Sequence, residues 1–198
     1  MKPMTPHGVE MLKSHRFVSP LALSFIALLI AVGAATGAQA QSAQVFVSAR
    51  NGADGGGCAI ASPCRTVSYA LTQLQPRGQA MIVDSGDYDS SILIDKSVTI
   101  AAAPGVVAVF SPALPLGTIF STSGGPTFCS ALGVCDTVVL RGLTFDGQGV
   151  TQDAIRPGGM MLTVEDCHFS RFRLGIYMNG PGTLNVKRST FLDLEQGI

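Results

Sequence analysis

Three charged residues recur at matching places in the sequence and could together bind an acidic ligand. Arg141, Glu165 and Lys187 stand 24 and 22 residues apart, each directly after an aliphatic residue. If their segments stack, the side chains form a charged outward face that suits an acidic polysaccharide, with Glu165 as a calcium ligand. Opposite charges on neighbouring strands also commonly pair with one another. The sequence leaves both interpretations open.

A second set of polar residues lies near expected turns: Asp146, Asp153, Asp166 and His168. Two carboxylates can serve as acid and base on a glycosidic bond. Aspartate is also frequent in turns, because its side chain bonds to nearby backbone. Since no spacing here implies that two of them converge, we assign no catalytic residue, and Asp153 stays a candidate ligand contact.

Arg171 and Arg173 flank Phe172 and are further candidates for ligand binding. A guanidinium group binds carboxylates through two parallel hydrogen bonds, so this pair could grip uronates or sulfates. A solvated corner of the fold is the simpler interpretation.

The cysteines indicate the compartment. Cys58 and Cys64 are separated by five residues, and so are Cys129 and Cys135. This spacing, without a nearby histidine, is not that of a zinc site. We therefore predict two local disulfides, which fit an exported protein. Cys167 is left over, and its place in the repeat predicts an inert core residue.

These residues belong to a repeat of about 22 residues, which must position them. The segments 138–145, 162–169 and 184–191 superimpose and end in Phe145, Phe169 and Phe191. Apolar and polar residues alternate in each, as in a strand with one buried face. A second register joins Ile155, Ile176 and Ile198, in Asp153-Ala-Ile, Leu174-Gly-Ile and Gln196-Gly-Ile.

Such short repeats cannot bury their own apolar face, but stacking them buries a continuous core. We expect an all-β fold, a right-handed parallel β-helix of roughly five coils over residues 81–198. Residues 41–80 supply an N-terminal strand, a disulfide loop and a capping helix. Within 66–74, Val67, Ala70, Leu71 and Leu74 share one helical face. Thr66 is the expected N-cap.

Residues 1–40 read as a signal peptide. Basic residues up to Arg16 precede the apolar run 20–34, and Ala38-Gln-Ala40 supplies small residues for cleavage. We expect the mature chain to have no membrane span and to be exported to the periplasm or the cell exterior.

The whole chain has 13 basic and 13 acidic residues. This balance argues against a nucleic-acid partner.

The stretch from Val45-Phe-Val-Ser through Gly86-Asp-Tyr to Lys96-Ser-Val-Thr-Ile resembles the opening of right-handed β-helix proteins of the pectin-lyase-like superfamily. The resemblance covers nearly all of 44–198 and implies the fold, while the superfamily includes lyases, hydrolases, epimerases and adhesins. Residues 138–170 are similar to the stretch of pectate lyases that leads into their calcium-binding strand. Glu165 holds the place of an aspartate there, and the family's further acidic ligands and catalytic arginine have no counterpart.

We therefore expect a non-catalytic protein that binds glycan or acts as an envelope-surface scaffold. The alternative is a lyase or hydrolase acting on an acidic polysaccharide. No cofactor is expected except calcium under the lyase alternative. Self-association through the C-terminal coil is a further prediction, because Ile198 falls at a core position without a cap.

Overall fold

The computed structural model describes residues 41–88, 91–112, 118–122, 137–178 and 180–198. Cys129, Cys135, Ala38 and Ala40 lie outside these residues, so the second disulfide and the cleavage site stay predictions. The described chain is mostly β-strand with one short helix, which confirms the all-β expectation. Its elements are β1 (Ser42–Val47), α2 (Val67–Gln73), β2 (Leu74–Ile82), β3 (Gly86–Tyr88), β4 (Ile92–Ile94), β5 (Val98–Ala102), β6 (Ala108–Phe110), β7 (Phe120–Thr122), β8 (Thr137–Arg141), β9 (Leu143–Arg156), β10 (Met161–Glu165), β11 (His168–Ile176), β12 (Thr183–Lys187) and β13 (Thr190–Leu192).

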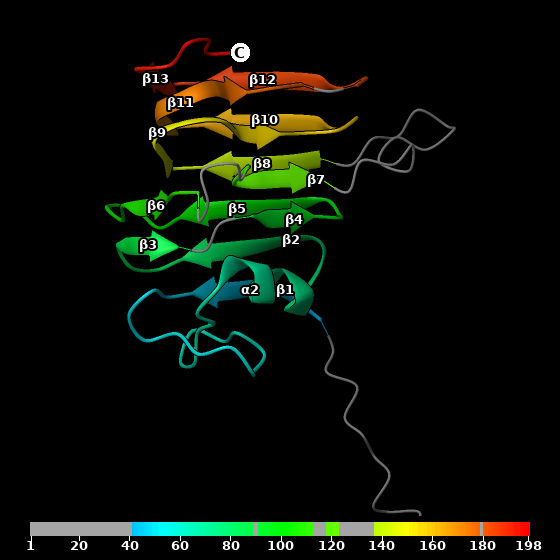
Figure 1. Ribbon diagram of the computed structural model, residues 1–198. Coiled ribbons are helices and arrows are strands. Elements are labelled where there is room, and N and C mark those ends of the chain that lie inside the picture. Colours follow the sequence, from blue (N-terminus) through cyan, green and yellow to red (C-terminus); the bar gives the residue numbers. More distant parts are fainter. Residues whose placement is uncertain (1–40, 89–90, 113–117, 123–136, 179) are drawn as a thin grey trace, which may run out of the picture. The chain divides into compact units, whose positions relative to one another are not determined.

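The strands form two sheets in which every pair is parallel. One sheet has the order β1-β2-β5-β8-β10-β12. The other runs β13-β11-β9-β6-β3, and β7 pairs with both β4 and β9. Figure 1 shows these strands lying one above another, and from β8 to β13 successive strands alternate between the two sheets. This arrangement is compatible with a parallel β-helix.

The register follows the sequence repeat. Val164 pairs with Leu140 on one side and Val186 on the other, and Glu165 pairs with Arg141 and Lys187. In the second sheet, Phe169 pairs with Phe145 and Phe191. The predicted superposition of the three segments is thus confirmed, because residues one repeat apart are adjacent across the ladder.

Aromatic rings fill the centre. Phe145 and Phe169 are fully buried, and the ladder continues to Phe191, which is partly buried. Tyr88, Phe110 and Phe120 extend it toward the N-terminal end. Stacked phenylalanines at repeat spacing follow from the in-register pairing of identical residues.

In the N-terminal segment, the helix α2 packs against β1 and β2. The helix α2 begins after Thr66, whose hydroxyl accepts a hydrogen bond from the Tyr69 N–H, as the predicted N-cap should. It buries Val67, Ala70 and Leu71. The Cys58–Cys64 disulfide is present, with Cα atoms 4.8 Å apart. Because β1 pairs with β2, the first sheet begins at Ser42, within the segment that precedes the expected coils.

Candidate functional site

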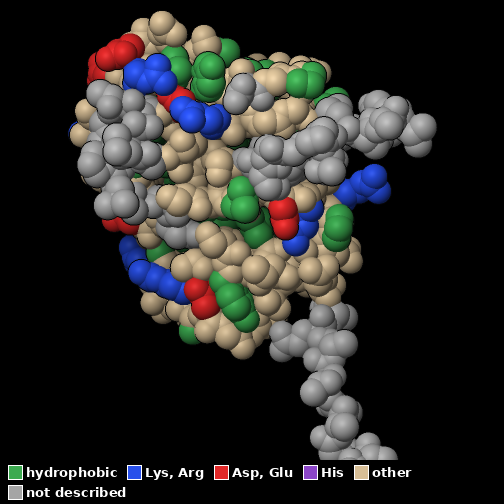
Figure 2. Space-filling model, turned by 45° about the vertical axis from the view of Figure 1, so that its right-hand side comes forward, with side chains coloured by type: hydrophobic (Ala, Val, Ile, Leu, Met, Phe, Trp, Pro, Cys, Tyr) green, Lys and Arg blue, Asp and Glu red, His purple; other side chains and the backbone are tan. Residues whose placement is uncertain are grey.

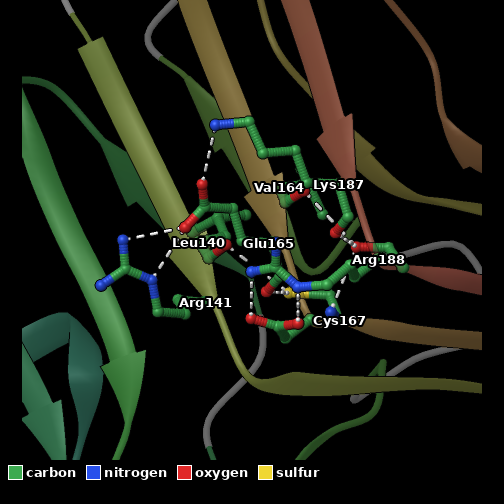
Figure 3. A network of polar contacts seen from close by, with 9 residues as sticks. Leu140, Arg141, Val164, Glu165, Cys167, Lys187 and Arg188 are labelled. Atoms are coloured by element: carbon green, nitrogen blue, oxygen red, sulfur yellow. Dashed lines mark hydrogen bonds and ion pairs between the residues drawn. The ribbon is translucent and has the colours of Figure 1, made fainter.

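The outward charges on β8, β10 and β12 pair with one another. Glu165 accepts hydrogen bonds from Arg141 Nε at 2.9 Å and from Lys187 Nζ at 3.1 Å, on different carboxylate oxygens. Figure 3 shows the carboxylate held between the two cations. These hydrogen bonds, that of Lys187 first, lower the pKa of Glu165. The three residues pair, as one of the two interpretations predicts, and a calcium ion would have to displace both cations.

A similar pair lies at the next position along these strands. Asp166 and Arg188 both have left-handed backbone, with φ of 53° and 46°. Arg188 Nε donates to one carboxylate oxygen of Asp166 at 2.7 Å and Nη2 to the other at 2.9 Å. The hydrogen bond lowers the pKa of Asp166. This two-point pair joins the residues that directly follow the paired strands β10 and β12.

A cleft lies over the second sheet, near β11 and β13. Its volume is about 550 Å³. It combines cationic, anionic and apolar groups, and its lining residues are Gly149, Arg171, Phe172, Arg173, Asp193, Leu194 and Glu195. Arg171 and Arg173 are both ligand candidates from the sequence, and the structure brings them to one hollow. Such a mixed lining can bind hydroxyl groups through the charged side chains and an apolar face through Leu194.

Arg171 is fixed in the cleft by Asp146. Its Nε donates to the Asp146 carboxylate at 2.8 Å, and its Nη2 contacts the second carboxylate oxygen. Partial burial raises the pKa of Asp146, but hydrogen bonds from Arg171 and the Gln148 N–H outweigh it, so the pKa lies below its usual value. A carboxylate of this kind stays ionised and is unsuited to donating a proton.

Arg173 is fixed by a different carboxylate. Asp153 has no exposed surface, and its Oδ1 accepts a hydrogen bond from Arg173 Nη2 at 2.6 Å. Its Oδ2 accepts from Arg156 Nη2 at 2.6 Å. Arg156 also lies over the ring of Tyr177, 5.5 Å from the centroid. Asp153 therefore joins the candidate arginine to two surface residues that the sequence argument did not consider.

Sequence reasoning missed Asp193 and Glu195, although a signal exists. They follow Arg171 and Arg173 by one repeat of 22 residues and carry the opposite charge. The burial of Asp153 also has a signal, because its register partner one coil later is Leu174. A charged residue at a position that is aliphatic in the neighbouring repeat predicts a buried side chain that pairs with an opposite charge.

The remaining candidates have local roles. Cys167 is buried, as its repeat position predicts, and burial raises the pKa of its thiol to about 11. His168 pairs with Thr144 and Thr190 in the ladder. Within the described ranges, no three histidine, cysteine, aspartate or glutamate side chains are placed to share a metal ion.

Charge is distributed in small opposite-sign groups. On the face drawn in Figure 2, acidic and basic side chains lie beside each other at several places outside the grey regions. Among the residues that the structure describes, no helix is long and apolar enough to cross a bilayer. The cleft at Arg171 and Arg173 combines charged and apolar groups that can contact a ligand.

No protein-family model, no curated protein and no solved structure matches this chain. The functional conclusion therefore rests on the side chains of the cleft and of its surroundings.

Proposed function

We propose that this chain is an exported right-handed parallel β-helix, of the pectin-lyase-like kind and roughly five coils long, that binds a glycan without cleaving it. The stacked parallel sheets and the 22-residue repeat support the fold. The apolar run at 20–34, the small residues Ala38 and Ala40, and the Cys58–Cys64 disulfide support export into an oxidising compartment.

The observation that carries the glycan proposal is the open cleft around Phe172. Arginine and carboxylate side chains are planar groups that can each bind two neighbouring hydroxyls of a sugar. Here Arg171 and Arg173 oppose Asp193 and Glu195 along one hollow. A saccharide can form hydrogen bonds with both kinds of group, and its apolar face can pack against Leu194.

Three carboxylates outside the cleft lining are poorly suited to act as the acid of a glycosidase. A glycosidase needs one carboxyl group whose pKa is raised so that it can protonate the leaving oxygen. The pKa values of Asp146, Glu165 and Asp166 are instead all lowered. These carboxylates are built to remain charged and paired.

Binding can be tested with the purified mature chain on immobilised pectate, alginate and neutral glycans, each with calcium and with a chelator. We expect retention on at least one glycan without release of products. Glu195→Gln should weaken retention, because an amide cannot accept as many hydrogen bonds from hydroxyls. Asp95→Asn, the same kind of change at an exposed residue before β5, is the matched control.

Two outcomes would overturn the proposal. Calcium-dependent release of unsaturated uronate ends would make the chain a lyase and Glu165 the first residue to mutate. A chain that retains none of the glycans, while folded by circular dichroism, would be a scaffold without a glycan site.

A further inference from the structure

A buried carboxylate beside the cleft holds two arginines at the surface. Asp153 is fully buried, whereas the side chains of Arg156 and Arg173 are 45% and 39% exposed. Arg156 reaches one carboxylate oxygen through Nε at 3.2 Å and Nη2 at 2.6 Å. Arg173 reaches the other through Nη2 at 2.6 Å. Both guanidinium groups are thus fixed by one residue.

This cluster has more positive charge than Asp153 needs. One carboxylate and two guanidinium groups leave a formal charge of one positive unit. A guanidinium has five N–H donors, and Asp153 uses only a minority of them in each arginine. The other donors belong to half-exposed side chains whose positions are already set by folding. Binding an anion there requires little further loss of side-chain freedom.

An aromatic surface lies next to these donors. Tyr177 is 44% exposed, and Arg156 lies 5.5 Å from its ring centroid. Arg173 also lines the cleft, so the arginine pair is continuous with the hollow where a glycan would lie. Because Arg156 lies over one face of this ring, a sugar beside it can contact only the part of the phenol that stays exposed, while its carboxylate meets the guanidinium groups.

The opposite charges of the cleft restrict the ligand further. Asp193 and Glu195 line the hollow, whereas Arg156 and Tyr177 are not among its lining residues. A sugar carboxylate placed beside Asp193 and Glu195 would meet like charges, whereas one placed beside Arg173 would not. A neutral sugar in the hollow, followed by an acidic sugar at Arg156, meets no such repulsion.

We propose that Arg156 and Arg173 form a uronate subsite, and that the ligand alternates uronic acid with neutral sugars. This inference rests on the proposed glycan-binding function and names the ligand class for the same site. Asp153 acts as a positioning residue, because it orients both arginines from inside the fold without being accessible itself.

The subsite can be tested directly by nuclear magnetic resonance. Methyl glucuronide is titrated into the labelled mature chain while the arginine Nε–H signals are followed, with methyl glucoside as the uncharged control ligand. We expect the glucuronide to shift the Arg156 and Arg173 signals and the glucoside to leave them unchanged. Arg156→Gln should weaken glucuronide binding about tenfold, the loss of one charge-assisted hydrogen bond.

Two variants make the result specific. Arg188→Gln makes the same change of charge at the Asp166 pair and should leave the affinity unchanged. Arg156→Lys keeps the charge but loses the planar fork, and should bind more weakly than the unaltered chain. Equal effects of Arg156→Gln and Arg188→Gln would overturn the subsite, as would equal shifts with both sugars or none.

The polysaccharide panel separates the two proposals. If the chain retains a neutral glycan but methyl glucuronide shifts neither arginine, the uronate subsite alone is wrong. If no glycan is retained and the glucuronide does not bind, the proposed function fails and the subsite with it. Tighter binding of an all-uronate oligomer than of an alternating one would overturn the alternation.

Discussion

The rings of Phe145 and Phe169 stack face to face, with centroids 4.6 Å apart and planes within 5° of parallel. Phe191 continues the stack at 4.8 Å. Centroid spacings of this size match the distance between paired strands, since each ring comes from one rung of the same ladder. Phe169 is therefore packed between the rings of Phe145 and Phe191.

Removing the middle ring should be costly. Phe169→Ala should lower the free energy of unfolding by about 3–5 kcal/mol, because it leaves a cavity between two rings. Phe191→Ala should cost less, since that ring is only partly buried. Denaturant unfolding of both variants measures the difference, and equal losses would contradict a ladder that packs most tightly at Phe169.

Asp84 should make the free energy of unfolding depend on pH in the acidic range. Its carboxylate accepts hydrogen bonds from the Ala49 and Arg50 N–H groups and from the hydroxyls of Ser48 and Tyr88. Burial raises its pKa, but these hydrogen bonds outweigh burial and lower the value from 3.8 to about 2. The stabilisation is therefore complete above pH 3.8 and lost as pH falls toward 2.

Asp84→Asn should consequently reduce stability by about 1–3 kcal/mol at neutral pH and by less near pH 2. Denaturant unfolding at both pH values tests this. The Asp95→Asn variant, the same change at an exposed position, is the control. A constant deficit for Asp84→Asn from pH 7 to pH 2 would argue against a role for the ionised form.

The ion pairs of Glu165 should contribute little to the stability of the fold, and only at low ionic strength. Its partners Arg141 and Lys187 are about half exposed, so salt screens the pairs. Because its pKa is lowered, the contribution exists above the ordinary value of 4.5 and fades as pH falls through the folded-state value. Glu165→Gln should lower the melting temperature slightly in low salt and not in high salt. A large drop that persists in high salt would speak against this.

Cys167 should resist alkylation in the folded chain. Its side chain is buried and its pKa is about 11, so little reactive thiolate exists at neutral pH. Iodoacetamide treatment followed by mass spectrometry should find the Cys167 peptide unmodified in buffer and modified in denaturant. Rapid labelling under native conditions would show that this position opens.

Self-association stays a prediction. Among the described residues, the strand β12 lies at one end of its sheet and Leu192 is 50% exposed, while Ile198 is exposed and does not occupy the core position expected from the repeat. An uncovered strand edge with apolar neighbours favours pairing with another chain. Sedimentation velocity should show larger species as concentration rises, and Val186→Pro in β12 should reduce them. A concentration-independent monomer would rule this association out.

The sequence by itself determined the repeat and the contacts between neighbouring coils. Period-2 alternation and the 22-residue spacing predicted which residues share a face, so the register of the phenylalanines was predicted correctly. The pairing of Glu165 with Arg141 and Lys187 was one of the two interpretations that the sequence left open. The N-cap at Thr66 and the core position of Cys167 were equally local. These features depend on which residues lie next to each other across paired strands, and the spacing of a repeat identifies those neighbours directly.

Only the tertiary structure decided how the turns arrange their side chains. The cleft forms where Arg171 in β11 and Asp193 just after the neighbouring β13, both with left-handed backbone, lie side by side in its lining. The contact of Asp153 with its two half-exposed arginines depends on the long β9 strand, whose register with β11 shifts between Phe172 and Leu174. Such shifts break the period, so spacing alone cannot place Arg156 and Arg173 on one carboxylate. Charged side chains pair with the opposite charges that lie near them in space. The irregular corners of the fold determine which charges those are.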